Sequence, residues 1–241
     1  MTWYKKYLSV YEQPLQEAPQ EIIREIKTKI EKLQSDTPLV SVVIIAYNEE
    51  KHLLANLWSL SDSECQYPME IIGVDNDSSD KTAEIFKMTG VPYYTEYEHS
   101  CGYARRCGLQ YAQGKYYICI DSDTMYPPGY VQAMADALQR PGIVAVSSLW
   151  SYMPDEGHPW LGLKIYEFMR DTHLWMQSFK RPELSVRGLV FAYNADYGRK
   201  VGYRVDIIRG EDGSMALGLK QYGRIGFVRS RKARAVTGYG T

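Results

Sequence analysis

Five short apolar runs, rich in β-branched residues, constrain the fold of this 241-residue chain more than any other sequence feature. The first run, Leu39 to Ala46, is almost continuously apolar, which is typical of a central parallel strand covered on both faces. The runs are 39–46, 69–75, 91–94, 115–121 and 143–149, separated by segments of helical length at 50–61, 80–89, 103–113 and 128–139. This alternation predicts βαβ units and therefore an α/β fold with a mostly parallel, doubly wound sheet.

The regions that flank these runs are less regular. Residues 1–37 carry isoleucines spaced for one face of a helix, so we interpret them as an N-terminal helical extension of a single domain, 38–241. That domain divides into a regular half, 38–149, and an irregular half, 150–241. In the second half we expect helices across the sheet opening at 150–184, a strand at 185–193, a short helix at 211–222 and one or two edge strands at 224–237. The apolar residues of the first of these segments are expected to be buried helix faces, namely Trp160, Leu161, Leu163, Ile165, Phe168, Trp175 and Met176.

Composition excludes several classes of protein. Lysine and arginine number 28 and aspartate and glutamate 29, so a net charge of −1 offers no broad basic field, and we expect no nucleic-acid partner. The four cysteines show no CxxC spacing, which predicts reduced thiols. The N-terminal residues lack a secretory apolar region, and no stretch reaches the roughly 18 apolar residues of a membrane span. We therefore expect a cytoplasmic protein, and peripheral contact with the inner face of the membrane stays open.

Acidic and amide residues follow three of the predicted strands. They are Asn48 and Glu49 after the first, the segment 75–80 after the second, and Asp121 with Asp123 after the fourth. Ligands of open parallel sheets bind beyond the carboxyl ends of the strands, where these side chains would meet. Asp121 and Asp123 are two residues apart, so both could point to one side and hold a hard divalent cation together with phosphate oxygens. As a structural alternative, the same residues are common in helix caps and solvated turns.

Five segments, in this order, resemble the motifs of the inverting glycosyltransferases of family 2, which have the nucleotide-sugar-binding GT-A fold. They are 42–50 (VVIIAYNEE), 74–82 (VDNDSSDKT), 104–108 (ARRCG), 121–123 (DSD) and 210–212 (GED). The resemblance implies a donor-binding half, 38–149, and an acceptor-side half, 150–241. The chain departs from the family pattern in having Asp75-Asn76 where two acidic residues are usual, Arg106 where asparagine is common, and no QxxRW after the last motif. The last departure argues against a processive polymer synthase.

The resemblance also implies roles for individual residues in binding the donor. Asp75 would accept a hydrogen bond from the imide of a uracil-like base, and Arg105 would lie near the diphosphate or close the base pocket. A UDP-sugar is the favoured donor. The residues implied in nucleotide-sugar binding are Ala46, Tyr47, Glu49, Asp75, Arg105, Asp121 and Ser122.

For the chemistry, the resemblance implies that Asp123, with Asp121 beside it, binds Mn²⁺ or Mg²⁺ and that Asp212 is the catalytic base. A cation stabilises the charge of the leaving phosphates, and a carboxylate takes the proton of the attacking hydroxyl. Asp212 stands near the start of a predicted helix, where the macrodipole favours the ionised form that a base needs. The expected reaction is a single displacement with inversion.

The sequence thus predicts a metal-dependent transfer of a sugar from a nucleoside diphosphate to the hydroxyl of a glycan or lipid-linked acceptor, in a bacterial surface polysaccharide pathway. Two alternatives remain: a nucleotidyltransferase that forms the sugar nucleotide, and an inactive sugar-nucleotide-binding module. Tyrosine adds a further expectation, because the chain has 21 tyrosines against 5 phenylalanines. We expect several tyrosines to line one cleft at the carboxyl edge of the sheet, from the set Tyr47, Tyr103, Tyr126, Tyr152, Tyr166, Tyr193, Tyr197 and Tyr203.

Overall fold

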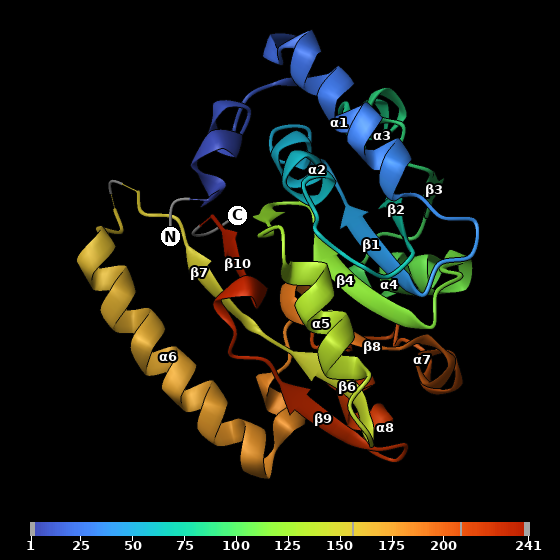
Figure 1. Cartoon of the computed structure of the whole chain (residues 1–241), viewed down its shortest axis with the longest axis vertical. Helices are drawn as coiled ribbons and strands as arrows, with labels where there is room; N and C mark the ends of the chain where they lie inside the picture. The colour runs from blue at the N-terminus through green and yellow to red at the C-terminus, as the bar shows by residue number, and fades with distance from the viewer. Residues whose placement is uncertain (1–2, 156, 208, 239–241) are drawn as a thin grey trace.

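The computed structural model describes residues 3–155, 157–207 and 209–238, and within them the chain forms a seven-stranded sheet beside a three-stranded one (Figure 1). The large sheet has the order β3-β2-β1-β4-β8-β6-β9. Its strands are β1 (Val40–Ala46), β2 (Met69–Asp75), β3 (Tyr93–Thr95), β4 (Tyr116–Asp121), β6 (Ile143–Ser147), β8 (Phe191–Asn194) and β9 (Arg224–Phe227). All neighbours pair in parallel except β8, which runs antiparallel to β4 and β6. The predicted α/β fold with a mostly parallel sheet is confirmed.

Helices cover both faces of this sheet because its central strands are apolar on both sides. Along β1, Val42 and Ile44 join one buried cluster, whereas Val43 between them joins the other. The first cluster is completed by α1 (Gln20–Leu33), α2 (Leu53–Ser61), α3 (Thr82–Thr89) and α5 (Tyr130–Leu138). The second is completed by α4 (Cys101–Tyr111), α7 (Ala195–Val201) and α8 (Glu211–Leu219). The two-sided burial holds the strand ends rigidly at one edge.

The N-terminal segment packs on the first face. A 3₁₀ helix (Trp3–Ser9) and α1 both lie against α2, and Tyr7, Ile26 and Ile30 are buried in the same cluster as β1. The helical spacing of the isoleucines is confirmed by α1. Residues 1–2 lie outside the described part of the chain. No helix among the described residues is both long and apolar enough to cross a membrane.

The irregular half differs from the prediction in three respects. The small sheet, in the order β5 (Thr124–Met125), β10 (Arg234–Thr237), β7 (Leu149–Tyr152), contains a strand inside the segment 150–184, where only helices were expected. Its central strand is β10, so 224–237 supplies one edge strand, β9, and one interior strand. The predicted strand at 185–193 is shorter, because two 3₁₀ turns precede β8.

A further difference, in burial rather than in element type, concerns α6 (Trp160–Lys180), a 21-residue helix at the outer edge of the molecule (Figure 1). Of the seven apolar residues expected to be buried helix faces, Leu163 is buried. The other six are exposed, with exposed fractions from 38% for Trp175 to 74% for Phe168. The expectation of a buried apolar face is therefore wrong, and this helix turns its apolar side outward.

Candidate active site

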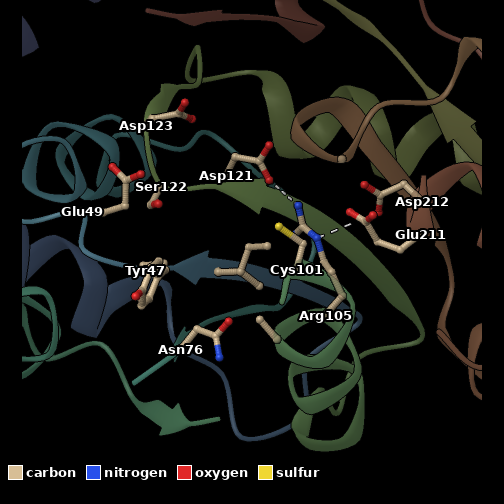
Figure 2. Close-up of a pocket in the computed structure, with 14 residues that line it drawn as sticks. Tyr47, Glu49, Asn76, Cys101, Arg105, Asp121, Ser122, Asp123, Glu211 and Asp212 are labelled. Atoms are coloured by element: carbon tan, nitrogen blue, oxygen red, sulfur yellow. Dashed lines mark hydrogen bonds and ion pairs between the residues drawn. The ribbon is translucent and has the colours of Figure 1, made fainter. Parts of the chain in front are cut away.

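A pocket of about 320 Å³ opens where β1 and β4 end and α8 begins (Figure 2). Figure 2 shows acidic side chains converging on it from β4 and from the first turn of α8. Eight of the nine residues predicted from the sequence line it, namely Ala46, Tyr47, Glu49, Arg105, Asp121, Ser122, Asp123 and Asp212. The structure thus brings together residues that lie up to 166 positions apart in the sequence, from Ala46 to Asp212.

Asp75, the ninth residue, does not line the pocket. Its side chain is buried at the end of β2, 4% exposed, and its Oδ1 has no hydrogen-bond partner among the described residues. Burial raises the pKa of its carboxyl, against the opposing effect of hydrogen bonds from Ser78. Its neighbour Asn76 lines the pocket instead and donates from Nδ2 to the carbonyls of Glu96 and Glu98, both at 2.8 Å.

Arg105 from α4 is the cation at the centre of the pocket. Its side chain is 1% exposed, its Nη2 forms an ion pair with Asp121, and its Nη1 donates to the carbonyl of Ile120 at 3.1 Å. Its Nε lies 4.0 Å from Oδ1 of Asp212. The carboxylates of Asp121 and Asp212 would repel each other unless a cation joined them, so the arginine makes their approach feasible. The motif resemblance implies that Arg105 lies near the diphosphate or closes the base pocket, and this stays a prediction; in the structure Arg105 lies between two acids.

The carboxyls beside Arg105 have altered acidity. Burial raises the pKa of Asp212 to about 7, with Arg105 opposing the shift and Glu211 and Asp121 adding to it. Burial likewise raises the pKa of Asp121 to about 6, and Arg105 again opposes the shift. The sequence-based expectation considered only the macrodipole, which favours the ionised form of Asp212, whereas burial and the neighbouring acids act in the opposite direction and raise its pKa.

Asp121 and Asp123 are the residues that fit a divalent cation. Both line the pocket; Oδ1 of Asp123 accepts a hydrogen bond from the Thr124 hydroxyl at 2.9 Å, while Asp121 already neutralises Arg105. Among the described residues no cluster of three or more His, Cys, Asp or Glu side chains could hold a metal ion. The donor set fits a hard cation that takes its remaining ligands from phosphate oxygens and water.

Hydrogen bonds between neighbouring loops fix the β1 side of the pocket. Asn48 has a left-handed backbone (φ 53°), and its Oδ1 accepts from the amide of Ser79 at 2.8 Å. The amide of Glu49 donates to the Thr82 hydroxyl at 2.8 Å. Asp80 also supports this turn, since its Oδ1 accepts from the amide of Thr82 at 2.9 Å. Asp80 thus has the structural role of supporting a turn, whereas Glu49 lines the pocket.

Sequence reasoning missed six lining residues, namely Ile45, Asn76, Cys101, Ala104, Gly188 and Glu211. Glu211 and Asn76 stand next to predicted residues, so adjacency could have found them. Gly188 had no local signal, yet a Cβ there would collide with the carboxylate of Asp212 and lie 3.0 Å from Arg105. This position therefore needs glycine for the acids and Arg105 to approach one another.

The expectation about tyrosines is wrong. Of the eight named from the sequence, Tyr47 lines the pocket, 52% exposed, and its ring meets His99 edge-on at 5.1 Å. Tyr126 lies buried behind the pocket, where its hydroxyl donates to the carbonyl of Leu189 at 2.8 Å. Tyr193 and Tyr203 are buried with their hydroxyls 3.2 Å apart. Apart from Tyr47, none of the eight lines this pocket.

A mostly parallel sheet with acids at its carboxyl edge and an antiparallel strand inserted beside β4 is the arrangement of a GT-A type fold. Solved structures share this fold. Glucosyl-3-phosphoglycerate synthase from Mycobacterium tuberculosis, crystallised with Mn²⁺, UDP-glucose and phosphoglyceric acid, is 21% identical and matches 86% of this chain and 73% of that one, with a TM-score of 0.59. S. aureus TarS (residues 1–349) in complex with UDP is 18% identical and matches 83% and 60%, with a TM-score of 0.61.

Sequence comparisons agree with the fold. The family model "Glycosyl transferase family 2" matches residues 41–198, more than half of the chain, so the chain belongs to glycosyl transferase family 2. Among curated relatives, the glycosyltransferase SunS of Bacillus subtilis is 34% identical over 96 residues, 39% of this chain and 22% of SunS. The dolichol-phosphate mannosyltransferase of Pyrococcus furiosus is 30% identical over 115 residues, 45% of this chain and 32% of that enzyme. The chain thus spans less than a third of the length of either relative.

Proposed function

We propose that this glycosyltransferase moves a sugar from a UDP-sugar to an acceptor hydroxyl with the help of a divalent cation and with inversion at the sugar carbon. The observation that carries the proposal is the pairing of Arg105 with Asp121, 4.0 Å from Asp212, at the edge where Asp123 also lies. One wall thus offers acids suited to a cation that would bind the diphosphate. The other wall offers a separate carboxylate suited to act as a base.

The chemistry assigns one proton transfer to Asp212. In its ionised form, its carboxylate takes the proton of the acceptor hydroxyl while that oxygen bonds to the anomeric carbon of the sugar. The bond from the anomeric carbon to the β-phosphate oxygen breaks at the same time, and UDP leaves with the electron pair. Attack opposite the leaving group inverts the configuration in a single step.

The residues assigned to the donor divide the pocket further. Asp123 is the proposed direct ligand of Mn²⁺ or Mg²⁺; when bound, such a cation acts as a Lewis acid on the leaving diphosphate. Asp121 and Ser122 are proposed to face the ribose or the sugar, and Ala46, Tyr47 and Glu49 the base and ribose. Asp75, which is buried at the end of β2 and does not line the pocket, is assigned to the imide of a uracil-like base by the motif resemblance alone.

The acceptor-side proposal covers residues 150–241. A glycan or a lipid-linked sugar is the proposed acceptor and bacterial surface polysaccharide synthesis the proposed setting, supported by the motif resemblance. Gly188 and Asp212 line the pocket from this half of the chain. We therefore propose that the acceptor approaches the pocket from the side of α8.

The proposal is tested by incubating the purified chain with a panel of UDP-sugars and Mn²⁺ and measuring UDP release and the anomeric configuration of any product. We expect UDP release that EDTA abolishes and a product of inverted configuration. A product of retained configuration contradicts the single displacement. Pyrophosphate released from UTP and a sugar phosphate supports the nucleotidyltransferase alternative instead.

A further inference from the structure

Helix α6 exposes most of its large apolar residues. Its buried residues are Leu163, Glu167 and Leu174, whereas nine large apolar side chains are exposed. Six of these nine, which we call the apolar stripe, share one side of the helix: Leu161, Ile165, Phe168, Trp175, Met176 and Phe179. At 100° per residue they fall within a sector roughly 100° wide, as on an amphipathic helix, but the sector points away from the protein.

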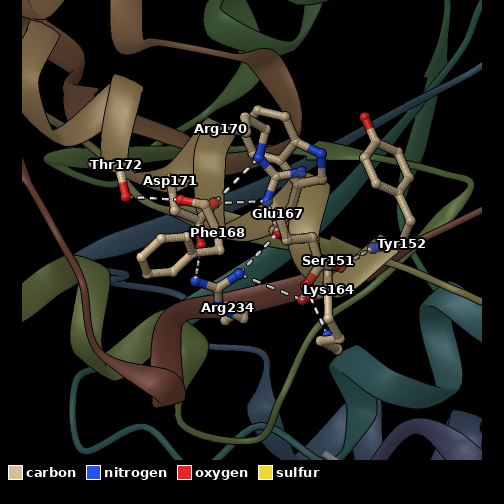
Figure 3. Close-up of polar contacts among 10 residues, drawn as sticks. Ser151, Tyr152, Lys164, Glu167, Phe168, Arg170, Asp171, Thr172 and Arg234 are labelled. Atoms are coloured by element: carbon tan, nitrogen blue, oxygen red, sulfur yellow. Dashed lines mark hydrogen bonds and ion pairs between the residues drawn. The ribbon is translucent and has the colours of Figure 1, made fainter. Parts of the chain in front are cut away.

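Ion pairs hold α6 in this orientation (Figure 3). Arg170 donates to the carbonyl of Trp150 and to Oδ1 of Asp171 at 2.8 Å, and its guanidinium lies 4.1 Å from the centre of the Trp150 ring. Arg234 on β10 pairs with the other oxygen of Asp171. Glu167 accepts from the amide of Tyr152 at 2.9 Å. Rotating the helix to bury its stripe would break the partly buried pair between Arg234 and Asp171 and the hydrogen bonds that Arg170 and Glu167 make with the backbone of β7, which is strongly unfavourable.

Most exposed charges beside the stripe are positive. All of residues 157–187 are described, and the exposed charged side chains among them are the basic Lys164, Lys180, Arg181 and Arg187. Lys164 and Arg181 pair with Glu167 and Glu183, and the exposed acid Asp155, just before this range, contacts His158. The acidic residues of this range are withdrawn, since Glu167 and Glu183 are buried and Asp171 is partly buried between two arginines. The surface therefore presents an apolar stripe within a basic border.

A further exposed cation lies beside the stripe, in the segment that follows β9. The guanidinium of Arg229, which is exposed, lies 5.0 Å from the centre of the Trp175 ring at the edge of the stripe. Aromatic rings next to arginine and lysine are the combination found in helices that lie in the headgroup region of a membrane. Their apolar side enters the acyl boundary while the cations meet anionic headgroups.

We propose that α6 docks on the surface of an anionic phospholipid bilayer, with the apolar stripe inserted and the helix axis parallel to the membrane. Its 21 residues extend about 31 Å, but the charged residues of its inner face exclude a spanning orientation. A second copy of the chain fits less well. Pairing two stripes would bring the basic borders of both copies together, and no exposed acidic residue of 157–187 would separate them.

The test is flotation of the purified chain with vesicles of phosphatidylcholine and phosphatidylglycerol in equal parts, with pure phosphatidylcholine vesicles for comparison. We expect the chain to float with the anionic vesicles and its bound fraction to fall at least tenfold in Phe168→Ser/Phe179→Ser. We expect Lys180→Gln/Arg181→Gln to weaken binding to anionic vesicles, and 0.5 M salt to do the same. Binding that is equal on both vesicle types contradicts the role of the basic border.

The matched control is Tyr97→Ser, which removes an aromatic side chain that is 73% exposed on the loop after β3. It should float like the unchanged chain, and circular dichroism should show that all variants remain folded. Absence of flotation, or an equal loss in Tyr97→Ser, overturns the proposal. So does a stable dimer in light scattering that becomes monomeric in Phe168→Ser/Phe179→Ser without vesicle binding, because the stripe would then be an interface between copies.

Discussion

At the scale of single residues, the site depends on one buried arginine that allows acids from two distant segments to approach. Burial alone would lower the pKa of Arg105, but Cys119, Asp121 and Asp212 raise it well above its ordinary value, so it stays charged. Asp121 is tied to this cation directly. Asp212 is not hydrogen-bonded to it, and its Oδ1 has no hydrogen-bond partner among the described residues. That free acceptor suits a group that must receive a proton.

The first prediction concerns Asp212→Asn. The amide keeps the shape of the side chain but cannot take a proton, so we expect donor affinity close to that of the unchanged chain and transfer reduced about 10²–10⁴-fold. Calorimetry with UDP and a turnover assay measure the two quantities. Asp196→Asn is the control, since Asp196 is an exposed carboxylate on α7, paired with Arg199. Turnover that is unchanged in Asp212→Asn would remove Asp212 as the base.

The second prediction is the pH dependence of transfer. Because the pKa of Asp212 is raised to about 7, a base at this position is protonated at acidic pH and becomes active as pH rises through that value. We therefore expect kcat/KM to increase between pH 6 and 8, by about tenfold per unit on the acidic limb. Protonation of Asp121, whose pKa is raised to about 6, should steepen the loss at lower pH. A flat profile from pH 5 to 8 is incompatible with this assignment.

The strand-end acids could be predicted because a parallel sheet collects the carboxyl ends of its strands at one edge. The environment of each acid could not be predicted. Asp212 was expected to be ionised on local grounds, whereas its acidity depends on burial and on Asp121 and Arg105, which lie about a hundred positions away in the chain. The expectation for the other seven tyrosines, Tyr47 apart, failed for the same reason, since a side chain's exposure is decided by elements packed on it from elsewhere.

At the scale of elements, the N-terminal helices are fastened to the domain by a charged cluster at the end of α2. Asp62 pairs with Lys6 of the first 3₁₀ helix and with Lys29 of α1 at 2.6 Å, and it accepts from the hydroxyl of Tyr7 at 2.7 Å. Burial would raise the pKa of Asp62, but these three donors lower it below its ordinary value. The extension is therefore an integral part of the packed structure.

The third prediction is that Asp62→Asn lowers the free energy of unfolding at pH 7 by about 1–2 kcal/mol, between the values for exposed and buried pairs. A carboxyl with a lowered folded pKa stabilises above its unfolded pKa, near 3.9, and this contribution is lost as pH falls through the folded value. Urea unfolding at pH 7 and pH 3 measures the difference, which should shrink at pH 3. Asp36→Asn, an exposed residue, is the control. An equal effect of both substitutions at pH 7 would contradict the fastening role.

Element types were predictable where an apolar run was long and unambiguous, as for β1, β2 and β4. The strand β7 was missed because Trp150, Ser151 and Tyr152 show no strand period, and β7 forms by pairing with β10, more than eighty residues away. For α6 the apolar positions were visible but the side that faces the protein was not. The partly buried ion pair between Arg234 of β10 and Asp171, together with the hydrogen bond from Arg170 to the carbonyl of Trp150, decides that orientation, and such contacts form between distant elements.

At the scale of the whole molecule, the sheet edge and α6 present two different surfaces. The edge holds a polar pocket of about 320 Å³, and α6 presents an apolar stripe with a basic border. The segment that connects these two surfaces is short. Gly188, which lines the pocket, lies eight residues after the end of α6. A membrane bound at α6 would thus be connected to the acceptor side of the pocket through a short segment, 181–188.

The measurement that tests the central claim most directly is calorimetric titration of UDP into the chain, with and without Mn²⁺. We expect saturable binding of one UDP, which Mn²⁺ strengthens at least tenfold. In Asp123→Asn we expect this Mn²⁺ effect to be lost, because Asp123 is the proposed cation ligand. The Asp196→Asn control should bind as the unchanged chain does. If UDP fails to bind in either condition, or if Mn²⁺ strengthens binding equally in Asp123→Asn, the pocket at the ends of β1 and β4 is not the donor site proposed here.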